Sequence, residues 1–355
     1  MIKLDEADPG MLVQARESRG LRQNDVAAAM SKHLGMTVSQ AWLSKAEAGR
    51  VSVTGDRLEA ISEVLRYPVD MLCEPPDSEG AGIGLIHHRK RASLGAPALR
   101  RIHGQLKFSL RQTTRLMARS AGDPHMFNRH ELAEDETAEE VAQGVRREWA
   151  LGTGPIPNVV ATVEKAGAVV LLRDLDTREL DAVSAWPAGG APLFLLNTAA
   201  PTDRARWSLA HELGHVIMHH EPGGTAVQEK QADMFAGEFL LPATSIRDQL
   251  RQGVNLNRLM RLKSVWGTSM AALARRALDV NALSEWQYRN LMIELSTLGY
   301  RMHEPVSLKP EHASKIYDVL QALMRDEGAT VEELAATAGL FPDEFEKLYL
   351  AVPSH

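Results

Sequence analysis

Residues 211–215 read His-Glu-Leu-Gly-His, and these residue types can together bind a metal ion and move a proton. Two histidines four apart lie on one face of a helix, about one turn along, so both imidazoles can bind the same ion. The glutamate after the first histidine can then accept a proton from a water on that ion. Imidazole nitrogen, a carboxylate and one open position are typical of catalytic zinc, so Zn²⁺ is the expected cofactor. The motif therefore predicts His211 and His215 as metal ligands and Glu212 as general base.

The residues around the motif indicate a buried helix. They are almost all apolar: Trp207, Leu209, Ala210, Leu213, Val216, Ile217 and Met218. A helix that is apolar nearly all round is buried. Buried His and Glu side chains need partners, and a metal ion supplies them. The alternative, a surface helix whose histidines face solvent, is disfavoured for this reason.

The third metal ligand must come from outside the motif. The nearby candidates are Glu229, Asp233, Glu238, His219 and His220. Residues 229–241 have helical apolar spacing and end before Pro242, so Glu229 and Asp233 lie one turn apart on a second helix. We expect Glu229 to be the third ligand and Asp233 to receive the other ring N–H of a ligand histidine. The alternative for Asp233 is a solvated helix residue, and His219 could contact substrate.

The two segments together resemble the ImmA/IrrE family of zinc metallopeptidases. The resemblance rests on Arg-Trp-Ser-Leu-Ala-His-Glu-Leu-Gly-His at 206–215 and on Glu-x-x-Ala-Asp-x-Phe-Ala-x-x-Phe-Leu-Leu-Pro at 229–242. It implies the same zinc ligands, His211, His215 and Glu229, and the same base, Glu212. It also implies a small α+β, zincin-like unit with the active-site helix packed on a sheet. Members of the family cut repressor proteins, so a repressor or antitoxin is the protein substrate implied.

The N-terminal segment is predicted to be a small all-α domain. Apolar spacing and glycine stops predict four helices, over residues 9–19, 23–30, 39–48 and 55–65. The second and third helices, with a glycine-containing turn between them, indicate a helix-turn-helix. In that motif the start of the second helix enters the major groove of DNA.

This segment resembles the XRE (lambda-repressor-like) DNA-binding family. The resemblance rests on Gln23, Val26 and Ala27, then Val-Ser-Gln at 38–40, Leu-Ser-Lys-Ala-Glu at 43–47 and Gly-Arg at 49–50. It implies that Ser39, Gln40 and Ser44 face bases with Lys45 beside them, and that Gln23 and Arg50 face phosphate. The interval 30–36 is longer than the usual turn, which leaves the register of the third helix open by one or two residues. XRE domains often act as dimers on paired half-sites, so a homodimer is plausible.

Charge is unevenly placed along the chain, whose net charge of −6 gives no overall nucleic-acid signature. Residues 1–75 hold nine Lys and Arg against eleven Asp and Glu, which weakens nonspecific DNA affinity. A protein-binding use of the same fold is therefore an alternative. Residues 81–122 hold nine basic and no acidic side chains, and residues 131–140 hold six acidic and no basic ones. The basic block could touch DNA phosphates, dock on the acidic block or be a solvated helix surface.

The length of 355 residues and the composition predict a multidomain chain. The predicted regions are a helix-turn-helix domain at 8–75, a linker and basic helical segment at 76–120, a zinc peptidase domain at 121–252, and a mostly α C-terminal region at 253–355. Within the last, residues 310–355 look like a separate three-helix unit without an assigned function. His87 and His88 are interpreted as surface residues of the linker.

Cysteine usage and the absence of long apolar runs bear on location. One cysteine, Cys73, suits a reducing cytosol. The N-terminus has no apolar signal core, and no run of eighteen apolar residues could span a membrane. We therefore expect a cytoplasmic protein without a membrane partner.

Three strands are predicted in the peptidase region, at 167–172, 182–186 and 192–197, after a helix that starts near residue 159. The strand at 193–197 could be an edge strand that aligns an extended substrate, or a plain core strand. Residues 269–276 could belong to another DNA-binding helix, although a packing helix is favoured.

Two classes of function follow. In the first, the chain is a zinc metalloendopeptidase that cuts a repressor or antitoxin in a stress response or a mobile element, with the N-terminal domain targeting it to DNA or to that partner. In the second, it is an XRE-type transcriptional regulator whose peptidase-like domain is mainly a sensor. The intact set of His, Glu, His and Glu favours the first. Self-cleavage within residues 76–97 is a third, weaker hypothesis.

Overall fold

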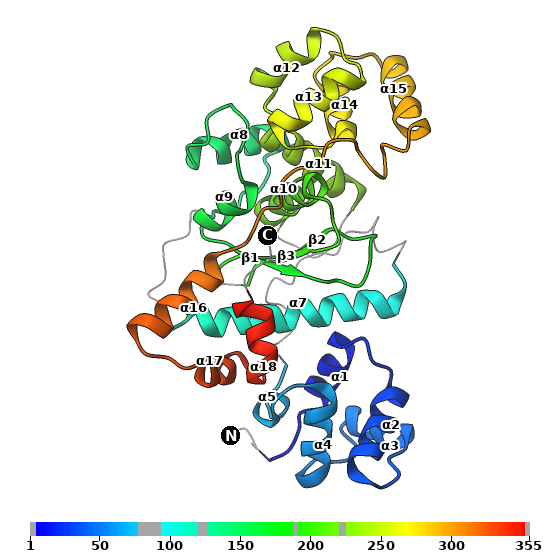
Figure 1. Cartoon of the computed structure of the whole chain (residues 1–355), viewed down its shortest axis with the longest axis vertical. Coiled ribbons are helices and arrows are strands. Elements are labelled where there is room, and N and C mark those ends of the chain that lie inside the picture. Colours follow the sequence, from blue (N-terminus) through cyan, green and yellow to red (C-terminus); the bar gives the residue numbers. More distant parts are fainter. Residues whose placement is uncertain (1–4, 77–93, 120–126, 188–189, 220–224, 352–355) are drawn as a thin grey trace. The chain divides into compact units, whose positions relative to one another are not determined.

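The computed structural model describes residues 5–76, 94–119, 127–187, 190–219 and 225–351 (Figure 1). These residues form two compact units, which confirms the multidomain class. Unit 1 contains the described residues up to 119 together with 315–351, and unit 2 contains those from 127 to 314. The predicted helical region 253–355 is thus divided between the two units. His87 and His88 lie outside the described residues.

Unit 1 is helical throughout its described part. Its elements are α1 (Pro9–Ser18), α2 (Gln23–Leu34), α3 (Gln40–Glu47), α4 (Gly55–Leu65), α5 (Val69–Cys73), α7 (Ala96–Met117), α16 (Lys315–Asp326), α17 (Val331–Ala338), α18 (Pro342–Phe345) and the π-helical turn η1 (Glu346–Leu350).

The turn between α2 and α3 is shorter than the sequence predicts. Helix α2 was predicted to end at residue 30, but it continues to Leu34 and stops at Gly35, whose φ of 66° is a left-handed helix cap. Ser39 then caps α3, because its Oγ accepts a hydrogen bond from the Trp42 N–H at 3.2 Å. These two caps set the register of α3, which begins at Gln40.

The C-terminal helices belong to unit 1, so the prediction of a separate unit at 310–355 is wrong. Helices α16 and α17 lie against α7 (Figure 1). The Tyr349 hydroxyl donates to Oε1 of Gln112 on α7 at 2.7 Å. The guanidinium of Arg66 donates to both carboxylate oxygens of Asp343, at 2.7 and 2.6 Å. Helices far apart in the sequence therefore share one core, which local sequence patterns do not report.

Basic side chains of α7 and of the turn that follows it pair with acids of unit 1. Arg111 is 3.2 Å from Glu74, and Arg119 is 3.4 Å from Glu327. The described members of the basic block thus include side chains that stabilise unit 1, a role that differs from docking on the acidic block.

Unit 2 combines helices with a small mixed sheet, as the α+β prediction required. Its elements are α8 (Ala138–Glu148), α9 (Val159–Lys165), β1 (Val169–Arg173), β2 (Ala182–Ala185), β3 (Leu193–Asn197), α10 (Thr202–Met218), α11 (Ala226–Leu240), α12 (Ala243–Arg251), α13 (Leu256–Trp266), α14 (Met270–Asp279) and α15 (Glu285–Thr297).

The sheet has the strand order β1-β3-β2, with β1 parallel and β2 antiparallel to β3. All five residues of β3 are buried. Because β3 is paired on both sides, it cannot align a substrate as an edge strand, and the core-strand alternative for 193–197 is the correct one. Among the described residues, β2 is an edge of the sheet beside α10.

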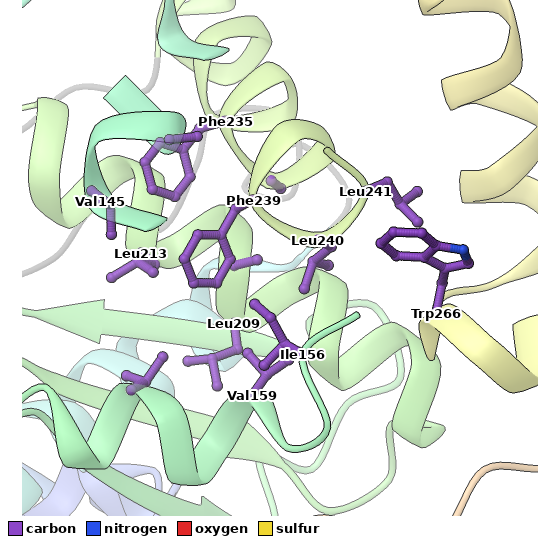
Figure 2. Packing of buried hydrophobic residues seen from close by; sticks show 14 of the residues in the cluster. Val145, Ile156, Val159, Leu209, Leu213, Phe235, Phe239, Leu240, Leu241 and Trp266 are labelled. Carbon is purple, nitrogen blue, oxygen red and sulfur yellow. The ribbon is translucent and has the colours of Figure 1, made fainter. Parts of the chain in front are cut away.

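The main core of unit 2 lies where α10 meets the sheet and α11. Leu209 and Leu213 of α10 face Phe235 and Phe239 of α11 (Figure 2). The two helices approach closely at Gly214, where an added Cβ would lie 3.0 Å from the Phe235 ring. The glycine inside the His-Glu-Leu-Gly-His motif is therefore a packing requirement of this helix pair.

Residues 301–314, which follow α15, are tied to the helices of unit 2 by buried charges. The Lys263 ammonium lies 2.6 Å from Asp203 and 2.7 Å from Glu304. Glu311 pairs with Arg206 of α10 and accepts the backbone N–H groups of residues 159 and 160 at 2.9 and 3.0 Å. Helix α14 is also a packing helix, as favoured, with Met270, Leu273, Ala274, Arg276 and Ala277 buried.

No helix among the described residues combines the length and the apolar character that a membrane crossing needs.

Candidate metal centre

Two helices bring the predicted ligands together. His211 and His215 lie on α10, and Glu229 lies in the first turn of α11. One ligand atom from each of the three residues lies within 4.8 Å of the other two. The Nε2 atoms of the two histidines are 3.1 Å apart, and the Glu229 carboxylate oxygens are 3.8 Å from Nε2 of His211 and 3.7 Å from Nε2 of His215.

The outer ring nitrogen of His211 faces a carboxylate. Its Nδ1 lies 2.9 Å from Oδ1 of Asp233, one turn after Glu229 on α11. A carboxylate accepts hydrogen bonds, so a neutral His211 that donates from Nδ1 to Asp233 has its lone pair on Nε2. The Asp233 side chain is 57% exposed, which places it at the surface end of the site.

His215 is oriented by a chain of two further side chains. Its Nδ1 lies 2.8 Å from Nδ1 of His219, whose Nε2 lies 3.1 Å from Oε1 of Gln231 on α11. If the Gln231 oxygen accepts from His219, then His219 accepts from Nδ1 of His215, and the lone pair of His215 also falls on Nε2. His219, for which the sequence suggested a substrate contact, lies between His215 and Gln231 in this chain of contacts. Gln231 was not anticipated, because no local pattern marks it.

The arrangement fits a bound cation. The Nε2 atoms of the two histidines, 3.1 Å apart with a carboxylate beside them, are placed so that all three groups can bind one positive ion. Two nitrogen ligands and one carboxylate, with a further position open, are the donor set of catalytic zinc. The chemistry of the donors thus agrees with the expected Zn²⁺.

The other candidates for the third ligand lie elsewhere. Glu238 is 2% exposed, pairs with Arg276 of α14 and accepts the Gln143 amide at 3.0 Å. It is therefore part of a structural charge cluster on another side of α11. His220 lies outside the described residues.

Glu212 lies inside unit 2, with 1% of its surface exposed. Its Oε2 accepts a hydrogen bond from the hydroxyl of Ser184 on β2 at 2.7 Å. Sequence reasoning did not find Ser184, because a single serine in a short apolar strand gives no functional signal. The contact exists only because α10 packs across β2.

A cavity of about 390 Å³ adjoins the metal cluster. Its walls include His211, Glu229 and Asp233, together with side chains of α10 and α14: Arg204, Trp207, Ser208, Ser269 and Ala272. Asp181 also lines the cavity, and the Arg204 guanidinium donates to its carboxylate at 2.7 Å. The cavity offers both apolar and charged surface next to the candidate ligands.

Comparison with known families decides what kind of domain carries this cluster. A peptidase family model described as the IrrE N-terminal-like domain matches residues 163–278, which include both helices of the cluster. A second model, described as a helix-turn-helix domain, matches residues 11–72. The chain is a fusion of a helix-turn-helix domain with an IrrE N-terminal-like domain. No curated protein matches it.

In this fusion the predicted DNA-contacting residues lie at the start of α2 (Gln23) and along α3 and the turn that follows it (Ser39, Gln40, Ser44, Lys45 and Arg50). The Gln40 side-chain amide donates to Oε1 of Gln23 at 2.6 Å, and the Gln23 amide donates to Glu47 at 2.8 Å. Ser39 is the α3 cap, Ser44 is half-buried, and Lys45 and Arg50 are exposed. Lys45 and Arg50 are thus accessible to a phosphate backbone, whereas Gln23 and Gln40 also hold α2 against α3.

Proposed function

We propose that the protein is a zinc-dependent metalloendopeptidase whose helix-turn-helix domain brings it to DNA. The observation that carries the proposal is the pair of histidine Nε2 atoms 3.1 Å apart beside Glu229, with the Glu212 carboxylate in the same helix. The match to a peptidase family over residues 163–278 supports it independently of this geometry.

In the proposed mechanism His211, His215 and Glu229 hold zinc. When bound, zinc would lower the pKa of a water molecule and polarise a peptide carbonyl. Glu212 accepts a proton from the attacking water and returns it to the leaving amine. Asp233 and His219 keep the two imidazoles in the tautomer that binds metal through Nε2.

The proposed substrate is a DNA-binding repressor or an antitoxin, cut in the cytoplasm to change transcription under stress or in a mobile element. The support is the fusion itself: a helix-turn-helix domain that binds DNA would bring the peptidase near operators, where repressors bind. Ser39, Gln40 and Ser44 are proposed to face bases, and Gln23, Lys45 and Arg50 to face the backbone.

The deciding experiment compares new protein N-termini in cells that carry the wild type or Glu212→Gln, with and without DNA-damaging or oxidative stress. We expect a cut in one DNA-binding protein that disappears with Glu212→Gln, while metal analysis shows that zinc is retained. Glu285→Gln, an exposed glutamate on α15, is the matched control and should leave the cut in place.

The absence of any Glu212-dependent cut would contradict the proposal. It would favour the second candidate, a transcriptional regulator in which the metal cluster is a sensor.

A further inference from the structure

The contact between Ser184 and Glu212 is buried deeply. The Ser184 Oγ donates to Oε2 of Glu212 at 2.7 Å, and each residue has 1% of its surface exposed. A carboxylate this far from water needs hydrogen-bond donors, since an unsatisfied buried charge is costly. Hydrogen bonds to an ionised acceptor are roughly twice as strong as neutral ones. The serine hydroxyl is therefore a substantial partner of the glutamate.

The position of the serine is unusual within its strand. The other residues of β2 are Ala182, Val183 and Ala185, all buried and apolar. A hydroxyl in such a strand costs free energy unless it is hydrogen-bonded, and Glu212 is the partner it finds. The last torsion of a glutamate side chain is broad, so a donor held rigidly by a strand determines which way the carboxylate plane faces.

The backbone of Ser184 is directed toward the edge of the sheet. The Asn197 N–H donates to the Asp181 carbonyl at 2.8 Å, and Ser184 lies opposite Phe194 in the register of β2 and β3. Hydrogen-bonded and non-hydrogen-bonded pairs alternate along antiparallel strands. Asp181, Val183 and Ala185 are accordingly the residues that bond to β3. The N–H and C=O of Ser184 point away from β3, where an extended peptide could add to the edge.

We propose that Ser184 is a positioning residue that holds the Glu212 carboxylate in the orientation needed for proton transfer, on the same strand that presents its backbone to the substrate. This inference rests on the proposed peptidase function. Ser184 acts through Glu212: its hydroxyl keeps its proton and fixes one carboxylate oxygen. Ser184 would then contact the base through its side chain and the substrate through its backbone.

The first part of the test requires no catalysis. Thermal unfolding of the full chain in a chelator is measured for Ser184→Ala, Glu212→Ala and the double variant. We expect Ser184→Ala alone to lower the Tm of the unit 2 transition by about 4 °C or more, and by about 1 °C or less in the Glu212→Ala background. Equal shifts in both backgrounds would overturn the proposal, because the hydrogen bond would then contribute nothing.

The second part measures the fraction of the Glu212-dependent cut in cells. We expect Ser184→Ala to lower it at least about tenfold with unchanged zinc content, and Ser184→Thr, which keeps the hydroxyl on a residue suited to strands, to restore most of it. Val170→Ala on β1 is the control for a loosened sheet, since Val170 is buried but pairs with β3 on its other side. It should retain the cut.

The outcomes separate the two proposals. A wild type that makes no Glu212-dependent cut overturns the peptidase function and the role of Ser184 with it, even if the Tm shifts show coupling. A wild type that cuts, with Ser184→Ala cutting equally well, overturns only the positioning role. Equal losses in Ser184→Ala and Val170→Ala would also overturn it, because they would reflect damage to the sheet.

Discussion

The chain that follows α15 is anchored first in unit 2 and then in unit 1, and the two anchors differ in kind. In unit 2 the ion pairs that hold the 301–314 segment are nearly excluded from water: Lys263, the partner of Glu304, is 3% exposed, and Arg206 and Glu311 are 6% and 9% exposed. In unit 1 the ion pairs are closer to solvent, with Arg66 and Asp343 40% and 71% exposed. There the apolar side chains Leu320, Leu334 and Phe345 are buried instead.

The different exposure of the ion pairs in the two units indicates where a single substitution should change stability most. Removing one partner of a buried ion pair leaves an uncompensated charge, whereas an exposed pair contributes little. The stability of unit 2 should therefore be sensitive to single charge changes near α10, the helix that carries His211 and His215. Unit 1 should tolerate them but depend on the whole C-terminal segment.

The largest effect is expected from removing residues 315–355. Unit 1 would lose the buried side chains of three helices, and the apolar face of α7 would be exposed to water. Burial of each large apolar side chain contributes about 1.5–3 kcal/mol to the free energy of unfolding. We expect the unit 1 transition to disappear in thermal unfolding while unit 2 still binds zinc. Glu332→Gln, exposed on α17, is the control and should unfold like the wild type. A cooperative unit 1 without the segment would refute the assignment of these helices.

Next in size is the loss of metal from Glu229→Ala. The two histidines would keep their places, but the site would lack the carboxylate that balances the cation. Metal analysis should find little zinc in this variant, and full zinc in Lys230→Ala, which changes the exposed neighbour. Full zinc content in Glu229→Ala would show that the third ligand is another residue. The unit 1 transition should be unchanged in both variants.

We expect Glu311→Ala to lower the free energy of unfolding of unit 2 by about 3 kcal/mol. The substitution removes the carboxylate partner of the buried Arg206 guanidinium and the acceptor of the N–H at the start of α9. Chemical unfolding of unit 2 measures this change. Glu285→Ala breaks an exposed pair with Arg289 in the same unit and should change stability by less than about 0.5 kcal/mol. Similar values for the two variants would remove the contrast between buried and exposed pairs.

A smaller effect, on metal affinity rather than on folding, is expected for His219→Ala. Loss of the partner of His215 Nδ1 should weaken zinc binding by roughly 10–100-fold. Competition with a chelator measures it, and zinc affinity equal to the wild type would mean that His219 does not orient His215.

The smallest effect is expected for Glu344→Ala in unit 1. Its carboxylate binds Arg19 through both oxygens, but Arg19 also donates to the carbonyls of residues 65 and 66. We expect a loss of about 1 kcal/mol or less in the unit 1 transition. A loss as large as that of Glu311→Ala would show that unit 1 also depends on single ion pairs.

Much of the candidate site follows from local sequence. Residues four apart share a helix face, so the pairing of His211 with His215 and of Glu229 with Asp233 is a property of each helix alone. The contact between these two helices could be inferred only from the family resemblance or from the fold. The three strands were also found from short apolar runs, but their order was not, since β3 lies between two strands that precede it in the chain.

The amino-acid sequence alone identified the residues that could do chemistry: the His-Glu-Leu-Gly-His motif on α10, the carboxylates on α11 and the helix-turn-helix pattern. These are properties of neighbouring residues, set by helix periodicity, whereas the end of α2 at Gly35 and the cap of α3 at Ser39 came from the structure. The fold was needed to see that Ser184 contacts Glu212, that His219 and Gln231 form a chain of contacts with His215, and that residues 315–351 belong to unit 1. The reason is physical: these contacts join segments brought together by burial of apolar surface, which leaves no local periodicity in the chain.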